Sequence, residues 1–424
     1  MGGKLALLGG EPLIGTPLTL LKAMGEEEVE AAAAVVRSGV LSAFIGAPGE
    51  FFLGGPQVRA FERKAADYFG VKHAITVNSW TSGLIAAVGA IGIEPGDEII
   101  TTPWTMSATA MAILHWNALP VFADIDPETF NIDPAKVEAL IGPRTRAILA
   151  VDIFGQSADM AALRDIADRY GLKLLGDTAQ APGSLIDGRF TGTLADIGGF
   201  SLNYHKHIHC GEGGILVTDD DRLAERLCLI RNHAESVIKS DVPANLANMI
   251  GYNFRMGEIE AAIASVQLDR LDDRVATRQR AARQLDEGLG KLRGIATPKV
   301  EAAGTHVYYV YGMKFDEAEL GVSRDRVVAA LRAEGAPGLG IGYQNLHLLP
   351  IFQQKIAYGT QHFPWTLAER DIDYGPGSCP VAEQIHRESF VGLNLCMCEF
   401  DEADIGQVIE VFDKVWANLD HLRL

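Results

Sequence analysis

The chain has 424 residues, too many for one hydrophobic core, and we therefore expect two domains. Its hydrophobic content of 48% and charged content of 22% are ordinary for a globular protein. A net charge of −18 argues against nucleic acid or an anionic membrane as a partner, but it allows an anionic substrate in a local basic pocket.

Cysteine usage and hydropathy favour a cytoplasmic protein. The five cysteines are odd in number and lack CxxC spacing, which suits a reducing compartment better than a disulfide framework. No apolar run approaches the length of a membrane span, about 18 residues, and the chain does not open on a signal-peptide pattern. We expect a soluble, cytoplasmic protein.

Residues 1–56 are rich in Gly, Pro and Leu, and we expect them to form an arm and a loop packed on the main body. From residue 57 the pattern alternates between apolar strands and amphipathic helices. Predicted strands cover 73–78, 98–102, 119–124, 147–152 and 172–177, and predicted helices cover 58–68, 105–116 and 159–170. This spacing predicts right-handed βαβ units and a mostly parallel central sheet flanked by helices, an α/β fold.

A second, smaller C-terminal α/β domain is expected beyond a strongly helical stretch at 258–289. The division we predict is a large domain over 57–275 and the smaller domain over 276–424. Residues 336–380 are rich in Gly, Tyr, His and Pro, which is typical of long loops that bind ligands.

The stretch SLNYHKHIHCGEGG at 201–214 carries the strongest chemical signal. It is a polar loop between two apolar strands and contains one lysine, Lys206. Because the strands draw the loop toward the core, the Lys206 amine should lose its proton more easily than a solvated lysine does. An uncharged, desolvated amine is what Schiff-base chemistry on a carbonyl requires. A solvated surface lysine is the alternative interpretation.

Two other features are expected at the same edge of the sheet. Asn78-Ser79-Trp80-Thr81-Ser82-Gly83 lies between a strand and a helix, where amides and hydroxyls bind phosphate or simply cap the helix. Asp177 ends a short apolar strand, and its buried carboxylate either caps the next turn or pairs with a protonated ring nitrogen. A lysine, a carboxylate and a phosphate-binding helix start are together what pyridoxal phosphate needs.

The sequence resembles the pyridoxal-phosphate-dependent sugar aminotransferases of the DegT–StrS type, which have the fold type I, or aspartate-aminotransferase, fold. The resemblance runs from about Pro56 to Asp272. It rests on ordered motifs: GGPQVRAFERKAADYFGVKHAITVNS, PVFADIDPETFNIDP, VDIFGQSADM, GDTAQAPG, SLNYHKHIHCGEGG and GYNFRMGEIEAAIASVQLDRLD.

The resemblance implies a role for each matching residue. Lys206 would form the internal aldimine (a Schiff base) with pyridoxal 5'-phosphate and later act as a base, and Asp177 would pair with the ring nitrogen. Gln180 would lie beside the ring hydroxyl. The remaining implied contacts are all to phosphate: Thr81, Ser82 and Ser201 within one subunit, and Asn253 reaching the neighbouring subunit's phosphate. A homodimer with sites at the interface follows.

Two positions depart from the family pattern. Trp80 stands where glycine usually precedes the phosphate threonine, and Met106 stands where an aromatic residue usually stacks on the cofactor. A thioether can lie against a ring, so Met106 is one candidate for the stacking residue and Trp80 is the other.

The implied reaction moves an amino group from glutamate or glutamine to a keto-sugar, through pyridoxamine phosphate as the intermediate. The acceptor would be a nucleotide-linked deoxysugar, a cyclitol or a related ketose. We expect the mouth of the site to include Tyr343, Gln344, Asn345, His347 and the 363–365 segment.

Three alternatives were weighed. A dehydratase branch of the family uses pyridoxamine phosphate but has histidine at the lysine position, so Lys206 argues against it. A metal enzyme would use His205, His207 and His209, which alternate like one face of a strand and could ligate zinc beside Cys210. A regulatory protein that lost catalysis is not favoured, because every required chemical group is present.

Overall fold

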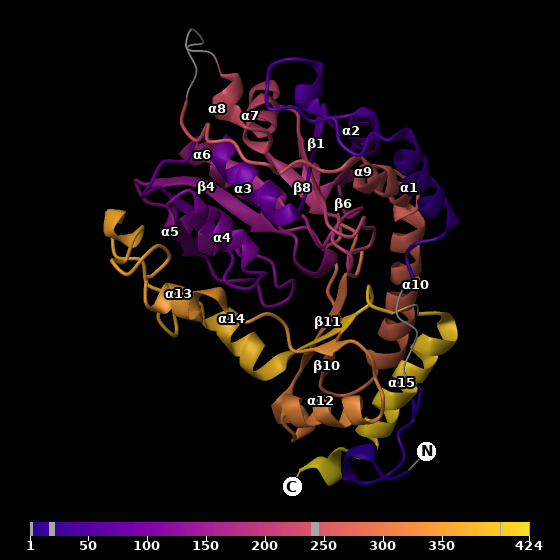
Figure 1. The fold of residues 1–424 in the computed structure, drawn as a ribbon. Helices are drawn as coiled ribbons and strands as arrows, with labels where there is room; N and C mark the ends of the chain where they lie inside the picture. The colour runs from indigo at the N-terminus through magenta and orange to yellow at the C-terminus, as the bar shows by residue number, and fades with distance from the viewer. Residues whose placement is uncertain (1–2, 17–21, 239–245, 399, 424) are drawn as a thin grey trace.

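The structure is a computed structural model that describes residues 3–16, 22–238, 246–398 and 400–423. The ribbon forms a larger and a smaller lobe, linked along one side by the long helix α10 (Leu271–Leu289), with both chain ends on the smaller lobe (Figure 1). Within these residues, no helix combines the length and the apolar content needed to cross a bilayer.

The larger lobe is built on a mixed sheet in the order β3-β2-β4-β5-β8-β9-β1. Parallel pairing joins β2 to β3 and β4, and β4 to β5, while a parallel bridge between Leu175 and Ile197 continues the sheet from β5 into β8. Only β9 runs antiparallel to its neighbours in this set. The strands are β1 (His73–Val77), β2 (Glu98–Thr101), β3 (Leu119–Phe122), β4 (Thr145–Val151), β5 (Lys173–Asp177), β8 (Gly198–Ser201) and β9 (Gly214–Thr218). The predicted, mostly parallel sheet is confirmed.

Helices cover both faces of this sheet because consecutive strand residues point to opposite sides. Ile99 packs in a cluster with side chains of α3 and α7, whereas Ile100 packs with side chains of α5 and α6. The helices of this lobe are α1 (Glu26–Ser38), α2 (Pro56–Phe69), α3 (Trp80–Ala90), α4 (Ala108–His115), α5 (Pro134–Leu140), α6 (Met160–Tyr170), α7 (Asp221–Arg231) and α8 (Ala234–Val237). A short hairpin, β6 (Leu185–Ile186) and β7 (Arg189–Phe190), completes it.

The smaller lobe has an antiparallel sheet in the order β10-β11-β13-β12. Its strands are β10 (Ile295–Ala296), β11 (Val310–Phe315), β12 (Leu339–Gly340) and β13 (Phe390–Asn394). The core of this lobe joins apolar side chains of β11 and β13 to those of α10, α12 (Arg324–Ala333) and α15 (Glu402–Trp416). A single turn, α11 (Glu317–Leu320), precedes α12.

The helical stretch predicted at 258–289 is two helices, α9 (Glu258–Leu268) and α10. The break lies at Asp269 and Arg270. Side chains of α9 pack in the larger lobe beside α2, and those at the far end of α10 pack in the smaller lobe. The break between the helices therefore allows one amphipathic stretch to contribute side chains to the cores of both lobes.

The arm and loop predicted at 1–56 divide between the lobes. Leu5 and Ile14 are buried in the core of the smaller lobe, where the Glu334 carboxylate accepts hydrogen bonds from Ala6 N (2.8 Å) and Leu13 N (3.1 Å). Helix α1, in contrast, packs along α9 in the larger lobe. The expectation that the whole arm packs on the main body is therefore wrong for residues 5–14.

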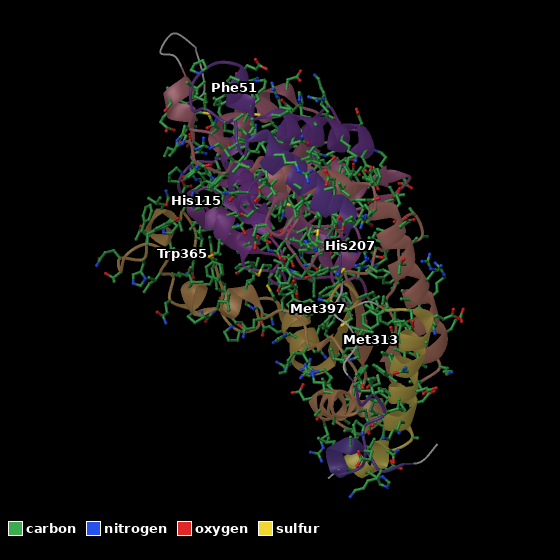
Figure 2. The ribbon with its side chains drawn as sticks, turned by 45° about the vertical axis from the view of Figure 1, so that its right-hand side comes forward. Phe51, His115, His207, Met313, Trp365 and Met397 are labelled. Atoms are coloured by element: carbon green, nitrogen blue, oxygen red, sulfur yellow. The ribbon has the colours of Figure 1, made fainter. Side chains whose placement is uncertain are left out.

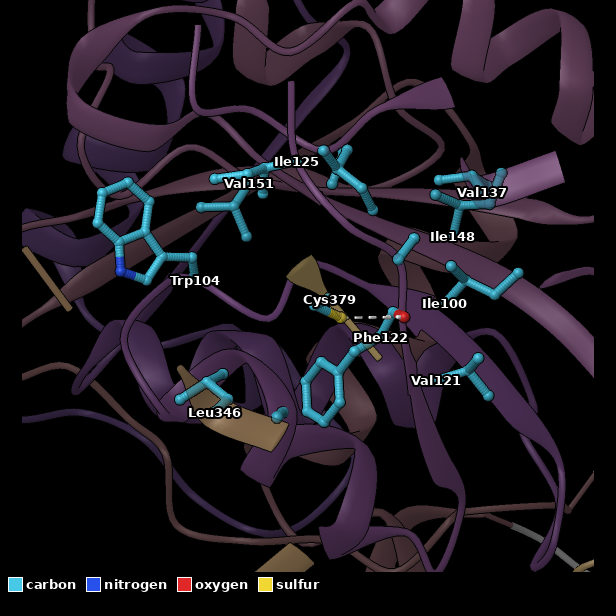
Figure 3. Packing of buried hydrophobic residues seen from close by; sticks show 14 of the residues in the cluster. Ile100, Trp104, Val121, Phe122, Ile125, Val137, Ile148, Val151, Leu346 and Cys379 are labelled. Carbon is cyan, nitrogen blue, oxygen red and sulfur yellow. Dashed lines mark hydrogen bonds between the residues drawn. The ribbon is translucent and has the colours of Figure 1, made fainter. Parts of the chain in front are cut away.

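Long loops that bind ligands were expected over residues 336–380, but much of the stretch from 346 to 385 packs on the larger sheet. Leu346 and Cys379 are buried among residues of β2 and β3, with Cys379 Sγ 3.8 Å from Phe122 O (Figure 3). The Arg370 guanidinium donates to both carboxylate oxygens of Glu98, at 2.8 and 2.6 Å. The stretch also contains two short helices, α13 (Pro350–Gln353) and α14 (Pro380–Gln384).

Candidate active site

The loops that follow β1, β5 and β8 meet at one edge of the larger sheet. Asp177 is the last residue of β5, and the Lys206 loop follows β8. The antiparallel β9 starts at this same edge, so Gly214 abuts the first turn of α3: a Cβ placed on Gly214 would lie 2.9 Å from Trp80 N. This convergence is what parallel strands with βα loops produce, and it is where open α/β sheets bind ligands.

Lys206 is buried, with 7% of the residue exposed. Desolvation lowers the pKa of its amine to about 8, although the negative charge of Asp177 partly opposes the shift. The Nζ atom lies 4.2 Å from the centre of the Tyr309 ring. The backbone of the loop turns back on itself, with Leu202 N donating to Gly213 O at 2.9 Å. About a tenth of the amine is therefore uncharged at pH 7, a far larger share than in a solvated lysine.

Asp177 is also buried, and its carboxylate is held by neutral donors. Trp80 Nε1 donates to Oδ1 at 2.7 Å, and Thr109 Oγ1 donates to Oδ2 at 2.8 Å. The backbone amide of Ala179 adds a longer contact to Oδ1 at 3.3 Å. The carboxylate is thus oriented from several sides, and its charge is available to a ligand.

The start of α3 offers hydroxyls and free amides to an anion. Ser79 is the N-cap, and its Oγ accepts from Ser82 N at 3.1 Å. The Ser82 hydroxyl lies 2.9 Å from the same Ser79 oxygen, so it is already engaged, whereas Thr81 is exposed. Ser201 is buried at the end of β8, where its Oγ accepts from Asn203 N at 3.3 Å.

Gln180 is fixed beside Asp177 by two hydrogen bonds. Its Oε1 accepts from Phe154 N at 2.9 Å, and its Nε2 donates to the Tyr343 hydroxyl at 3.1 Å. Tyr343 is therefore the member of the expected mouth group that reaches these residues. His347 and Trp365 are instead buried in the core. His347 Nε2 lies 3.0 Å from Glu383 Oε1.

The remaining residues of the expected mouth group do not gather around Lys206. Asn345 is buried and donates to Ala382 O at 3.4 Å, while Gln344 is exposed. Figure 2 shows Trp365 well apart from His207, which follows Lys206 directly in the chain. Aromatic composition had suggested ligand binding here, but most of these side chains fill the space between the segment and the sheet.

The two candidates for the stacking residue differ sharply in environment. Met106 is 55% exposed in the loop between β2 and α4. Trp80 is buried, and its indole nitrogen is committed to Asp177. Which of them contacts the cofactor ring stays a prediction. Trp80 already contacts the site in another way, because its indole nitrogen donates to the Asp177 carboxylate.

The three histidines around Lys206 do not converge as the alternation predicted. Their segment is a series of turns instead of a strand, so residues two apart do not share a face. His207 is fully buried and donates from Nε2 to Val307 O at 2.8 Å, while His209 Nδ1 accepts from Gly211 N at 3.4 Å. Across the described part of the chain, no group of three or more His, Cys, Asp or Glu residues is arranged to hold a metal ion.

Asn253 lies on the surface, next to the first residue of the predicted phosphate loop. Its backbone carbonyl accepts from Asn78 Nδ2 at 3.3 Å, and its side-chain Oδ1 accepts from Arg255 Nε at 2.7 Å. The side chain is exposed. A role toward a neighbouring subunit is compatible with this position and stays a prediction.

Two residues of the site escaped the sequence analysis. Thr109 lies inside α4 and Tyr309 lies three residues after the buried His306, and neither position has a local pattern that marks it. The sequence indicates a strand over residues 306–315, which includes this region. Tyr308 has a positive φ of 52°, and the backbone there departs from a strand. A tight turn bringing aromatics toward the sheet was therefore missed.

The residues present fit pyridoxal phosphate. A buried amine with a pKa lowered to about 8 can condense with its aldehyde, and the buried Asp177 carboxylate can hold a protonated ring nitrogen. The exposed Thr81 hydroxyl at the start of α3 suits a phosphate. Together with the mostly parallel sheet and the second, smaller α/β lobe, this arrangement defines a fold type I pyridoxal-phosphate enzyme.

Comparison with known proteins gives the family. The model of the DegT/DnrJ/EryC1/StrS aminotransferase family matches residues 26–393, and the chain belongs to this family. The protein is therefore a pyridoxal-phosphate-dependent aminotransferase.

Individual relatives agree with this assignment. The chain is 36% identical to GDP-perosamine synthase of Caulobacter vibrioides over 356 residues, which cover 84% of this chain and 89% of that protein. It is 34% identical to a putative L-glutamine:3-amino-2,3-dideoxy-scyllo-inosose aminotransferase of Streptomyces kanamyceticus, over 100% of this chain and 99% of that one. The crystal structure of S. venezuelae DesV in complex with a ketimine intermediate is 30% identical and superposes with a TM-score of 0.79, covering 95% of this chain and 99% of that one.

Proposed function

We propose that the protein transfers an amino group from glutamate or glutamine to the keto group of a nucleotide-linked deoxysugar, a cyclitol or a related ketose. The observation that carries the proposal is Lys206, whose amine is buried and has a pKa lowered to about 8 by desolvation. The printed names of two relatives support the acceptor class, since one is a GDP-perosamine synthase and the other a glutamine-dependent cyclitol aminotransferase.

The chemistry divides between the cofactor and the chain. When bound, pyridoxal phosphate supplies a sink for the electron pair left when a proton leaves the α-carbon of the amino donor. Lys206 would be the group that takes that proton and returns it, because a pKa lowered to about 8 lets its amine gain and lose a proton near neutral pH. The buried position of its Nζ, against the Tyr309 ring, limits competition from water.

Asp177 and Gln180 hold the cofactor in register with Lys206. The Asp177 carboxylate would keep the ring nitrogen protonated, which makes the ring the better electron acceptor. Gln180, fixed by Phe154 N and Tyr343, would meet the ring hydroxyl. Thr81, Ser82 and Ser201 would bind the phosphate, with Thr81 offering the free hydroxyl of the three.

We infer that the working unit is a homodimer. The loop at 41–53 exposes apolar side chains, among them Leu41, Ile45 and Phe51, the last at the outer edge of the larger lobe (Figure 2). This loop lies against the segment of Asn253, because Arg255 Nη1 donates to Phe44 O at 3.4 Å and Asn232 Nδ2 donates to Ile45 O at 3.1 Å. Exposed apolar side chains gathered at such a surface support a protein interface there.

The proposal is tested by an acceptor screen on the purified enzyme with pyridoxal phosphate. Glutamate or glutamine is offered with a panel of nucleotide-linked keto-sugars and keto-cyclitols, and consumption of the donor is measured. The Lys206→Ala and Lys206→Arg variants are the controls, and both should lose turnover and the violet absorption band of the bound cofactor. Turnover in either variant would overturn the role of Lys206, and wild-type enzyme that aminates none of the panel would overturn the acceptor class.

A further inference from the structure

Trp80 stands in the first turn of α3 and is buried, with 7% of the residue exposed. Its indole Nε1 donates to Asp177 Oδ1 at 2.7 Å. The two residues are 97 positions apart in the chain. The contact therefore ties the start of α3 to the end of β5, directly at the carboxylate assigned to the cofactor ring.

Two glycines leave space for the indole ring: one on strand β8 and one on α3 itself. A Cβ on Gly199 of β8 would lie 2.5 Å from Trp80 Cη2 and Cζ3, and a Cβ on Gly83 would lie 2.8 Å from Trp80 Cε3. Real Cβ atoms do not approach so closely, so any larger residue would displace the ring. Glycine inside a helix is destabilising relative to alanine, and the indole beside Gly83 explains why glycine stands there.

The carboxylate that receives this bond has few other supports. Thr109 Oγ1 reaches Oδ2 at 2.8 Å, and the Ala179 amide reaches Oδ1 at 3.3 Å. Trp80 thus makes the shorter of the two hydrogen bonds to Oδ1, and Thr109 makes the hydrogen bond to Oδ2. One strong donor on each oxygen fixes the rotation of the carboxyl group about its Cβ–Cγ bond, because turning it would break both bonds.

We propose that Trp80 is a positioning residue, which holds the Asp177 carboxylate in the orientation that the ring nitrogen of pyridoxal phosphate needs. The inference rests on the proposed role of Asp177. It gives this aromatic side chain a place beside the carboxylate rather than a place stacked on the cofactor. Trp80 acts through Asp177 and has no direct part in the chemistry.

Trp116 is a matched control within the same hydrophobic cluster. It too is buried, and its Nε1 donates to a backbone carbonyl, Ile85 O, at 2.7 Å. A glycine of α3 also makes room for it, since a Cβ on Gly89 would lie 2.5 Å from Trp116 Cζ2. Replacing Trp116 removes the same kind of side chain and the same kind of bond without touching Asp177.

The test compares Trp80→Phe with Trp116→Phe. The dissociation constant of pyridoxal phosphate is measured by titrating the apoprotein, and the absorption spectrum of the loaded protein is followed against pH. A hydrogen bond to a charged group has the strength to change binding about tenfold or more, so Trp80→Phe should weaken cofactor binding by about that factor. It should also move the pH dependence of the spectrum, because the ring nitrogen loses its oriented partner. Trp116→Phe should lower the melting temperature while leaving both readouts at wild-type values.

Packing and hydrogen bonding are separated by an isosteric replacement. Site-specific incorporation of benzothienylalanine at position 80 keeps the shape of the indole and removes only its N–H donor, so it stays informative where Trp80→Phe fails to fold. It should reproduce the tenfold weakening and the spectral shift. Wild-type values for both would overturn the proposal.

Asp177→Asn distinguishes this inference from the proposed function. If Asp177→Asn changes the spectrum and the Trp80 variants do not, the role of Trp80 is wrong and that of Asp177 stands. If Asp177→Asn leaves the spectrum unchanged as well, the role of Asp177 itself is wrong.

Discussion

At the scale of single residues, burial decides the chemistry of Lys206. A lysine on the surface is protonated at neutral pH, whereas desolvation here lowers the pKa to about 8 from an ordinary 10.5. The nearby Asp177 carboxylate opposes this shift without cancelling it. The loop between two buried strands thereby produces an amine that loses its proton much more easily than a surface lysine does.

The shift has a consequence for stability that needs no activity assay. Because the folded pKa is depressed, the folded apoprotein binds fewer protons than the unfolded chain between pH 8 and pH 10.5. Burying Lys206 is therefore destabilising below pH 8, and the penalty is relieved as the pH rises toward 10.5. Relative to Lys206→Met, the wild type should gain on the order of 3 kcal/mol in unfolding free energy across this window.

Denaturant unfolding of the two apoproteins at several pH values measures this difference. The exposed Lys136 supplies the control, since Lys136→Met should follow the wild-type pH profile. A constant difference between wild type and Lys206→Met across the window would show that the amine is not desolvated in the folded protein.

Asp177 gives the second prediction at this scale. Asp177→Asn keeps a side chain of the same shape, so the cofactor should remain bound, but the ring nitrogen loses its charged partner. We expect kcat to fall about a hundredfold or more. Steady-state kinetics on cofactor-saturated enzyme measures the fall, and a variant within a few-fold of wild type would mean that another group holds that nitrogen.

At the scale of elements, the first turn of α3 has two functions that its residues divide. Ser79 caps the helix by accepting from Ser82 N, and it also occupies the Ser82 hydroxyl. Thr81 makes no such cap and is exposed. The sequence motif had assigned Thr81 and Ser82 alike to the phosphate, whereas the structure leaves the Thr81 hydroxyl as the freer of the two.

These roles predict that one substitution in this turn lowers stability and that another lowers cofactor affinity. Ser79→Ala should cost about 1 kcal/mol of unfolding free energy through loss of the cap. Thr81→Val should leave stability within about 0.5 kcal/mol of wild type and raise the dissociation constant of pyridoxal phosphate. Chemical denaturation and cofactor titration of both apoproteins provide the comparison, and a Thr81→Val protein with wild-type cofactor affinity would remove Thr81 from the phosphate site.

At the scale of the whole molecule, Asn253 decides whether one subunit can make a complete site. Its side chain is exposed and could reach the site of a neighbouring subunit. Its backbone carbonyl, however, accepts a hydrogen bond from Asn78 of the same chain, so the side chain could instead serve the site of its own subunit. The two arrangements predict different outcomes when inactive variants are mixed. The test combines Lys206→Ala with a bulky change, Asn253→Trp, that would block phosphate binding.

If sites are shared across a dimer, subunit exchange should restore activity. In a mixed dimer one site then carries both lesions and the other carries neither, so up to half of the mixed dimers' sites should work. Differently tagged subunits and pull-down measure the exchange itself. Absence of recovery despite proven exchange would place Asn253 in the site of its own subunit.

The sequence alone determined the parts of the protein that depend on short-range pattern. Apolar strands separated by amphipathic helices specify a mostly parallel sheet, because buried strands and flanking helices have distinct periodicities. Parallel βα units bring the ends of their strands to one edge, so Asp177 and Lys206 could be expected together before any coordinates were known. Flanking apolar strands were also sufficient to predict that the Lys206 amine would be desolvated.

The tertiary structure alone decided which side chains touch across long stretches of chain. The donors to Asp177 come from 68 and 97 residues away, and no local pattern marks Thr109 or Trp80 as its partners. His347 and Trp365 have the composition of a ligand-binding loop, but both are buried, His347 beside the Phe122 ring of β3 and Trp365 in the same core cluster as that ring. Such contacts depend on how the elements pack, because periodicity specifies which face of an element is apolar and not which distant element will cover it.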